Sequence, residues 1–291
     1  MKYTVTHKTT YRYSAAVHQS YHLLHLSPRG VPHQRILRHR IATQPHSELQ
    51  YDLCDFFGNP YSILAVEEDH KELVVEAISQ LDVSENSPGD LAETVDWKQL
   101  AQDSARGNRT VPKDVIQFAI ASRHGRRLRA LADYARPSFP PGQPVLLGVE
   151  NLMSRVFSDF TFDASATDVS TPVEAVLKNR RGVCQDFAHL MIAALRSIDL
   201  PARYVSGYIR TIPPEGQARL QGADASHAWI SVWAPETGWV DFDPTNNVIP
   251  RGDHITIAHG RDYDDVSPIS GVLLGGGAHT VEVAVDVAPI A

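Results

Sequence analysis

The fold is decided by the stretch Arg181-Gly182-Val183-Cys184-Gln185-Asp186-Phe187-Ala188-His189-Leu190-Met191. From Cys184 the apolar residues recur with a helical period as far as Ile198, and Leu200-Pro201 ends the pattern. This predicts a helix that carries Cys184 in its first turn, on the buried face. The helix dipole and unpaired backbone N–H groups favour a thiolate there. Gly182 allows the backbone to turn sharply or to approach a neighbour closely.

A β-hairpin is predicted further along the chain. Residues 227–233 are rich in Trp, Ile and Val, Pro235-Glu236-Thr237-Gly238 is typical of a turn, and residues 239–243 predict the return strand, which Pro244 stops. His227 begins the first strand and Asp243 ends the second. The sequence therefore places an imidazole and a carboxylate at the same end of one hairpin.

The hairpin leaves two questions open. Simple pairing puts Asp243 opposite Ile230, roughly 10 Å short of His227, so a bulge, a twist or another turn register has to close the gap. Asp241 would share a face with Asp243, so spacing does not choose between the two carboxylates. An ordinary surface hairpin and a buried structural cysteine would also explain these residues singly. Together they supply the nucleophile, the base and the orienting acid that cysteine-dependent acyl transfer requires.

At these residues the chain resembles the bacterial transglutaminase-like superfamily, whose core is papain-like. The ordered motifs are residues 182–191, 201–208, 224–229 and 238–246, within a match over about residues 145–250. A weaker likeness runs through residues 11–14, 26–29 and 55–59 to the β-rich N-terminal region of many bacterial members.

The resemblance implies that Cys184 is the nucleophile, His227 the base and Asp243 its orienting partner, because the acid of the family precedes Pro-Thr. Members include transglutaminases, peptidases, amidases and deamidases, so the motifs indicate the chemistry more than the substrate. We expect a peptide or protein amide substrate and hydrolysis rather than cross-linking, since transfer needs a second amine site. The alternatives are protein-glutamine gamma-glutamyl transfer, a non-catalytic binding module on the same scaffold, and a protein partner that docks on the N-terminal region.

The predicted fold class is α+β, with a β-sandwich-like domain at residues 1–90 and the catalytic core with a C-terminal strand at residues 91–291. Runs at residues 3–13, 36–43, 61–66 and 73–83 predict strands, and residues 91–157 have a helical pattern. Residues 213–226 predict a loop that delivers His227. Residues 280–287 alternate and predict a strand that completes one of the sheets.

Composition sets further expectations. With 43% hydrophobic and 21% charged residues, the 291-residue chain is typical of a globular protein. The net charge of −7 argues against a nucleic-acid or anionic-membrane partner, and the N-terminus lacks the apolar core of a signal peptide, so we expect the cytoplasm. A Cys54–Cys184 disulfide is not expected in that compartment. The 14 histidines lack a tight ligand spacing, so no metal and no cofactor are expected.

Overall fold

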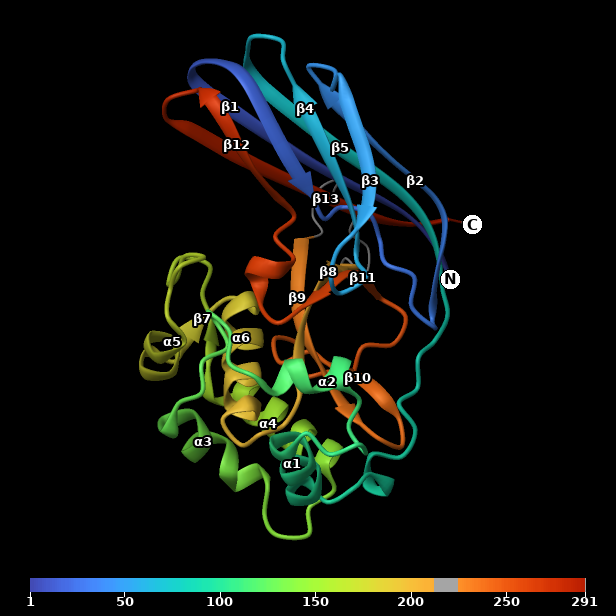
Figure 1. Cartoon of the computed structure of the whole chain (residues 1–291), viewed down its shortest axis with the longest axis vertical. Coiled ribbons are helices and arrows are strands. Elements are labelled where there is room, and N and C mark those ends of the chain that lie inside the picture. Colours follow the sequence, from blue (N-terminus) through green and yellow to red (C-terminus); the bar gives the residue numbers. More distant parts are fainter. Residues whose placement is uncertain (212–224, 291) are drawn as a thin grey trace, which may run out of the picture.

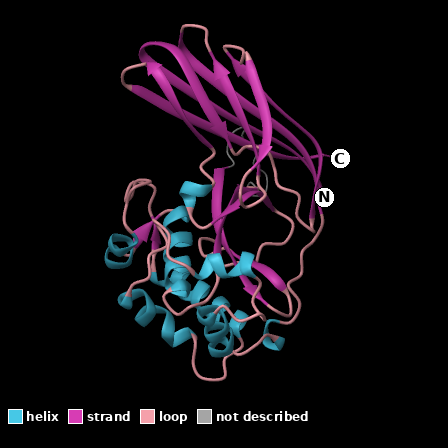
Figure 2. Ribbon diagram, viewed as in Figure 1, coloured by secondary structure: helices cyan, strands magenta, loops and turns pink. Residues whose placement is uncertain are grey.

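The computed structural model describes residues 1–211 and 225–290 (Figure 1). A large sheet forms one end of the molecule, and the helices lie at the other end together with a smaller sheet (Figure 2). The strands are β1 (Lys2–Leu24), β2 (Gln34–Gln44), β3 (Leu49–Cys54), β4 (Pro60–Val66), β5 (His70–Val83), β6 (Thr161–Phe162), β7 (Arg181–Gly182), β8 (Ala202–Ile209), β9 (Ala225–Ala234), β10 (Gly238–Phe242), β11 (His254–Gly260), β12 (Ile269–Gly275) and β13 (His279–Ile290). The α-helices are α1 (Trp97–Arg106), α2 (Lys113–Ile116), α3 (Arg129–Ala135), α4 (Val145–Asp159), α5 (Val173–Asn179) and α6 (Cys184–Arg196), with 3-10 turns η1 (Leu91–Glu93), η2 (Gln117–Ala119), η3 (Arg136–Ser138) and η4 (Tyr263–Asp265).

The larger sheet has seven strands built around β1. The first half of β1 pairs with β5 and β13, and its second half pairs with β4 and β12. The register shifts between Arg12 and Val17, where the two halves meet. Side chains from this sheet form a small apolar core of their own, which includes Val17, Leu64 and Leu73. The β-rich character of the N-terminal region is thus confirmed, but its strands form one sheet that shares β1.

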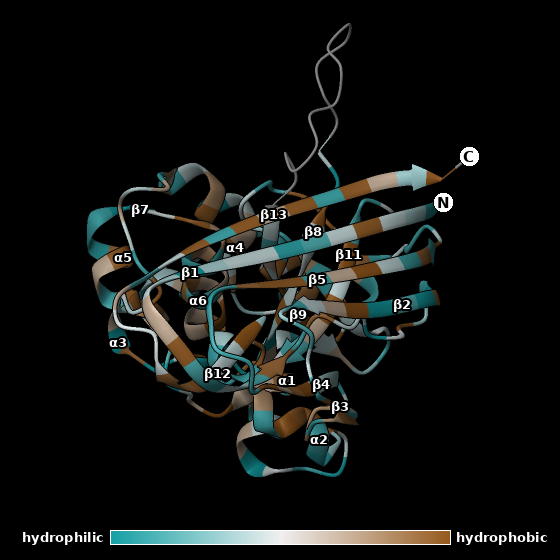
Figure 3. Ribbon diagram, turned by 90° about the horizontal axis from the view of Figure 1, so that it is seen from above, coloured by the Kyte–Doolittle hydropathy of each residue, from teal (hydrophilic) through white to brown (hydrophobic). Residues whose placement is uncertain are grey.

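Both ends of the chain belong to this sheet. Strand β13 pairs with β1 along its whole length, and β13, β1, β5 and β2 lie side by side when the molecule is viewed from above (Figure 3). The predicted C-terminal strand at residues 280–287 is therefore confirmed, and it joins the sheet of the N-terminal region. The division of the chain after residue 90 stays a prediction.

The second part of the molecule packs helices on a four-stranded sheet in the order β10-β9-β8-β11. Helix α6 lies against β9 and β8, and its residues from Asp186 to Arg196 are all buried. The apolar core of this part continues into the larger sheet through Tyr3, Val5 and Val285. Burial of that shared surface is the main force that holds the two parts together.

Two side-chain amides also join the two parts at the edge strand β11. Gln34 donates to the carbonyl of Thr256 at 2.7 Å and accepts its N–H at 2.9 Å. Asn59 does the same for His259, at 2.7 Å and 2.8 Å. These buried amides satisfy backbone groups that an edge strand would otherwise leave unpaired. The sheet above the core is therefore held at a defined position.

Two surface features bear on possible partners. The basic cluster at residues 123–129 forms salt bridges with Asp264, Glu174, Asp199 and Asp133. Among the described residues, every helix is too short or too polar to span a bilayer.

Candidate active site

Cys184 is the first residue of α6, as the periodicity predicted. The carboxylate of Asp186 accepts the N–H of Val183 at 2.8 Å and the hydroxyl of Thr167 at 2.6 Å, so it holds the start of the helix. A Cβ on Gly182 would lie 2.7 to 2.8 Å from the Asp186 side chain. Glycine at position 182 therefore allows the backbone to lie close to the Asp186 side chain. The first-turn N–H groups of α6, which have no partner within the helix, lie near the thiol.

The register of the hairpin differs from the predicted one by one residue. Phe242, not Asp243, lies opposite Ile230. Asp243 lies just beyond the ladder and forms an isolated bridge with Val248. His227 Nε2 lies 2.7 Å from Asp243 Oδ2 as a result. The predicted gap is closed by this different register and by the turn after β10.

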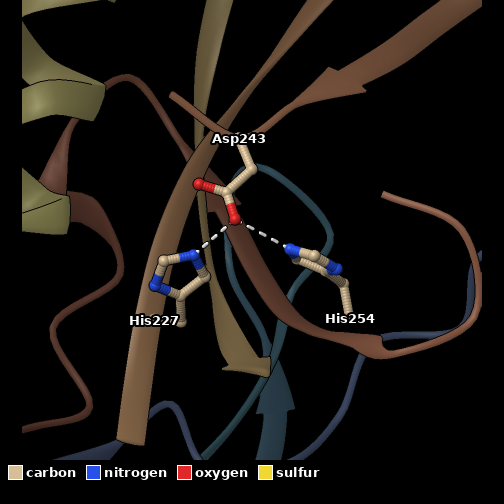
Figure 4. Close-up of side chains that lie close together, drawn as sticks. All are labelled: His227, Asp243 and His254. Carbon is tan, nitrogen blue, oxygen red and sulfur yellow. Dashed lines mark hydrogen bonds and ion pairs between the residues drawn. The ribbon is translucent and has the colours of Figure 1, made fainter. Parts of the chain in front are cut away.

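Asp243 is fully buried and both of its oxygens are hydrogen-bonded. Oδ1 accepts the backbone N–H groups of Thr245 at 2.9 Å and Asn246 at 3.2 Å. Oδ2 accepts from His227, from Asn246 Nδ2 at 2.7 Å, and from His254 Nε2 at 2.9 Å (Figure 4). Burial acts to raise the pKa of Asp243, but the hydrogen bonds from His227 and His254 and their charges hold it well below its usual range.

His227 is 8% exposed and is set between Asp243 and Cys184. Burial acts to lower its pKa, but hydrogen bonds to Asp243 and Cys184 and their negative charges outweigh burial and raise the pKa to about 10. Because Nε2 faces Asp243, the other ring nitrogen is left for the thiol. The imidazole is thus held in one orientation, and its neighbours favour its protonated form.

The two carboxylates of the hairpin have separate contacts. Asp243 meets His227, whereas Asp241 Oδ2 accepts the indole N–H of Trp229 at 3.1 Å. The geometry therefore pairs His227 with Asp243, as the resemblance implied.

Both cysteines of the chain are free.

A cavity of about 460 Å³ opens onto Cys184 and His227. Its core side includes Tyr204, and its opposite side is the larger sheet, through residues such as Thr9 of β1 and Val283 of β13. No Lys, Arg, Asp or Glu lies among the described residues that line it. The loop predicted to deliver His227 lies mostly outside the described residues, and its last two positions begin β9.

One buried cluster has the composition of a metal site. The ligand atoms of His227, Asp243 and His254 lie within 4.8 Å of one another. Zn²⁺ would need ligand distances of about 2.0 to 2.2 Å and histidine nitrogens free of protons. Here Asp243 Oδ2 instead accepts hydrogen bonds from both imidazoles and from Asn246 Nδ2. The contacts fit a hydrogen-bonded cluster, which a cation would have to disrupt.

Sequence reasoning missed His254. It lies on β11, outside every motif, in a run of β-forming residues that carries no signal of a site. Only the strand order, which sets β11 at the edge beside β8, explains its presence. Asn246 lies inside the last motif, but the hydrogen bond from its Nδ2 to Asp243 could be identified only in the structure.

The fold and this arrangement define a papain-like core, in which a cysteine at a helix N-terminus faces a histidine and a carboxylate from a sheet. The family models agree: residues 133–244 match the transglutaminase-like superfamily and residues 3–82 match the bacterial transglutaminase-like N-terminal region. The chain belongs to the transglutaminase-like superfamily.

Similar proteins include an uncharacterized protein of Mycobacterium tuberculosis, 39% identical over 99% of this chain and 93% of the relative. A protein-glutamine gamma-glutamyltransferase of Pseudomonas aeruginosa is 29% identical over 60% of this chain and 26% of its own length. A solved structure from Cytophaga hutchinsonii, described only as a candidate cysteine protease, has a TM-score of 0.77 at 22% identity and covers 99% of this chain and 90% of its own. That last likeness shows a shared fold over nearly the whole chain.

Proposed function

We propose that this protein is a cysteine-dependent acyl-transfer enzyme that acts on an amide or peptide bond. In this proposal Cys184 is the nucleophile, His227 the general acid and base, and Asp243 the group that orients His227. The observation that carries the proposal is the 2.7 Å contact between His227 and Asp243 beside the cavity that Cys184 enters.

The chemistry follows from these positions. The Cys184 thiolate attacks the amide carbon, and N–H groups at the start of α6 stabilise the oxyanion. The C–N bond then breaks, the leaving nitrogen takes a proton from His227, and a thioester remains on Cys184. A water molecule gives its proton to His227 and attacks the thioester, which releases a carboxylic acid and restores the thiol. An amine in place of water would give a new amide.

We favour hydrolysis over transfer. An amine acceptor approaches as an ammonium ion, and the described lining of the cavity offers no carboxylate to receive it. Transfer is the second candidate because one relative, of which the chain spans about a quarter, is named protein-glutamine gamma-glutamyltransferase. A described lining without Lys, Arg, Asp or Glu suits an uncharged acyl group such as a carboxamide.

A competition assay tests the proposal. Purified protein is given peptides with amide side chains, with and without an excess of a primary amine, and products are followed by mass spectrometry. Acid products in the presence of amine support hydrolysis, and amine adducts would replace hydrolysis by transfer. No product from wild type, or equal product from Cys184→Ala, would contradict the proposed enzyme and favour the binding-module alternative.

A further inference from the structure

A second cavity lies against the four-stranded sheet, away from Cys184. It has a volume of about 480 Å³ and includes Arg203 of β8, whereas Tyr204 and Ser206 of the same strand line the cavity at Cys184. Arg203 and Asp241 both pair with Ser231 of β9, so they share the face of the sheet that carries His227 and Trp229. The second cavity also meets the N-terminal region, through Arg29 and His33.

Arg203 is the unusual residue of this cavity. Its guanidinium group lies 4.1 Å over the ring of Trp239, and its Nε is buried without a hydrogen-bond partner. No carboxylate of the described residues lies in salt-bridge contact with it. Burial, opposed by the charge of Asp241 and assisted by that of Arg29, lowers the pKa of Arg203 to about 9. Buried donors are normally hydrogen-bonded, so the unpartnered Nε of Arg203 requires an explanation.

A second unpartnered group lines the same cavity. His259 is 4% exposed, and its Nδ1 has no hydrogen-bond partner in the described structure. Its pKa lies well below the usual range, because of burial and then the charges of Arg203 and Arg29. A neutral imidazole can donate from Nδ1. Two buried nitrogen atoms beside the cavity, Arg203 Nε and His259 Nδ1, therefore lack partners in the described structure.

The other charged groups of the cavity are already occupied. Arg29 Nη1 donates to the carbonyl of Phe57 at 2.7 Å and to Asn59 Oδ1 at 2.8 Å. Asp241 Oδ2 receives the indole N–H of Trp229. An anion that enters the cavity would therefore be met by Arg203.

We propose that this cavity binds a small carboxylate, held by the guanidinium group of Arg203 as it stacks on Trp239. The planar fork of arginine matches the two oxygens of a carboxylate, and the aromatic ring fixes the plane of the fork. One side chain, Trp229, links the cavity to the candidate active site. Its indole N–H donates to Asp241, and its ring centroid lies 5.1 Å from that of His254. The proposal does not depend on the acyl-transfer function.

Thermal unfolding of the full chain in sodium acetate and sodium succinate, against sodium chloride of equal ionic strength, tests this site. The wild type is expected to show a saturable rise in Tm with the carboxylates and none with chloride. Arg203→Gln removes charge-assisted hydrogen bonds and is expected to require about tenfold more carboxylate for the same rise. Arg129→Gln is the matched control, because Arg129 is 95% exposed, and it should behave as wild type.

A second variant protects the test if Arg203→Gln does not fold. Asp241→Asn keeps an acceptor for Trp229 but removes the nearest negative charge, so it is expected to tighten carboxylate binding. Equal shifts in chloride and carboxylate, or equal affinity in wild type and Asp241→Asn, would overturn the proposal. Saturation by inorganic phosphate alone would show an anion site but would contradict the assignment of a carboxylate.

Discussion

His254 Nε2 lies 2.9 Å from Asp243 Oδ2, the same oxygen that receives His227 Nε2. An ionised carboxylate only accepts hydrogen bonds, so both imidazoles donate to it. Asp243 is therefore held from two sides, by the proposed base and by a histidine from a different strand. We infer that His254 is a positioning residue, which fixes the carboxylate that orients His227.

Replacement of His254 by Phe should lower kcat by about tenfold, the effect of one lost hydrogen bond in the active state, with little change in KM. His254→Gln retains an N–H donor and should recover part of kcat. Steady-state kinetics on the best peptide found in the competition assay measures both. Equal losses in the two variants would indicate a purely structural role.

The proposed pairing of Cys184 with His227 predicts unusual thiol reactivity. In a Cys54→Ser background, iodoacetamide should alkylate Cys184 rapidly at pH 6, where an ordinary thiol is almost wholly protonated. His227→Ala should abolish the fast reaction, because the imidazolium that stabilises the thiolate is gone. Rates from pH 5 to 9 provide the measurement, and an unchanged profile in the variant would remove the basis for the pair.

The two carboxylates of the hairpin allow a matched comparison. Asp243→Asn should lower kcat by about a thousandfold or more, because an amide holds the wrong tautomer of His227 or none. Asp241→Asn preserves an acceptor for Trp229 and should retain activity close to wild type. If both variants lost activity alike, the assignment of the orienting acid would be wrong.

Local pattern was enough to predict several elements. The helix from Cys184, the hairpin at His227 and the strands that became β2, β4 and β5 were each indicated by periodicity and turn residues. Such signals arise from the burial of one face of a single element. They fix neither the partner of a strand nor its register.

The remaining features depend on contacts between distant segments. The hairpin register was predicted one residue away because the turn that links β9 to β10 sets it. His254 reaches Asp243 only through the pairing of β11 with β8, and β13 joins β1 from the far end of the chain. No periodicity within one segment contains that information.

The His227–Asp243 pair predicts a pH-dependent stability. The pKa of His227 is raised from 6.5 to about 10, so the folded state binds this proton more tightly than the unfolded state. The stabilisation is then complete below about pH 6.5 and is lost as the pH rises through about 10. In urea unfolding, the free energy of unfolding of wild type should exceed that of His227→Gln by about 3 kcal/mol at pH 6. The difference should be much smaller at pH 10. A difference that stayed constant with pH would contradict the raised pKa.

The start of α6 offers a test of how the thiol is positioned. Gly182→Ala places a Cβ 2.7 to 2.8 Å from Asp186, whose carboxylate holds the N–H of Val183 just before Cys184. Overpacking at such a contact should lower the free energy of unfolding by about 1 to 3 kcal/mol. The displacement should also slow alkylation of Cys184. Gly252→Ala is the control, because a Cβ at that position would meet nothing within 4 Å, and it should change neither property. Normal alkylation in a destabilised Gly182→Ala would show that Asp186 supports the helix without placing the thiol.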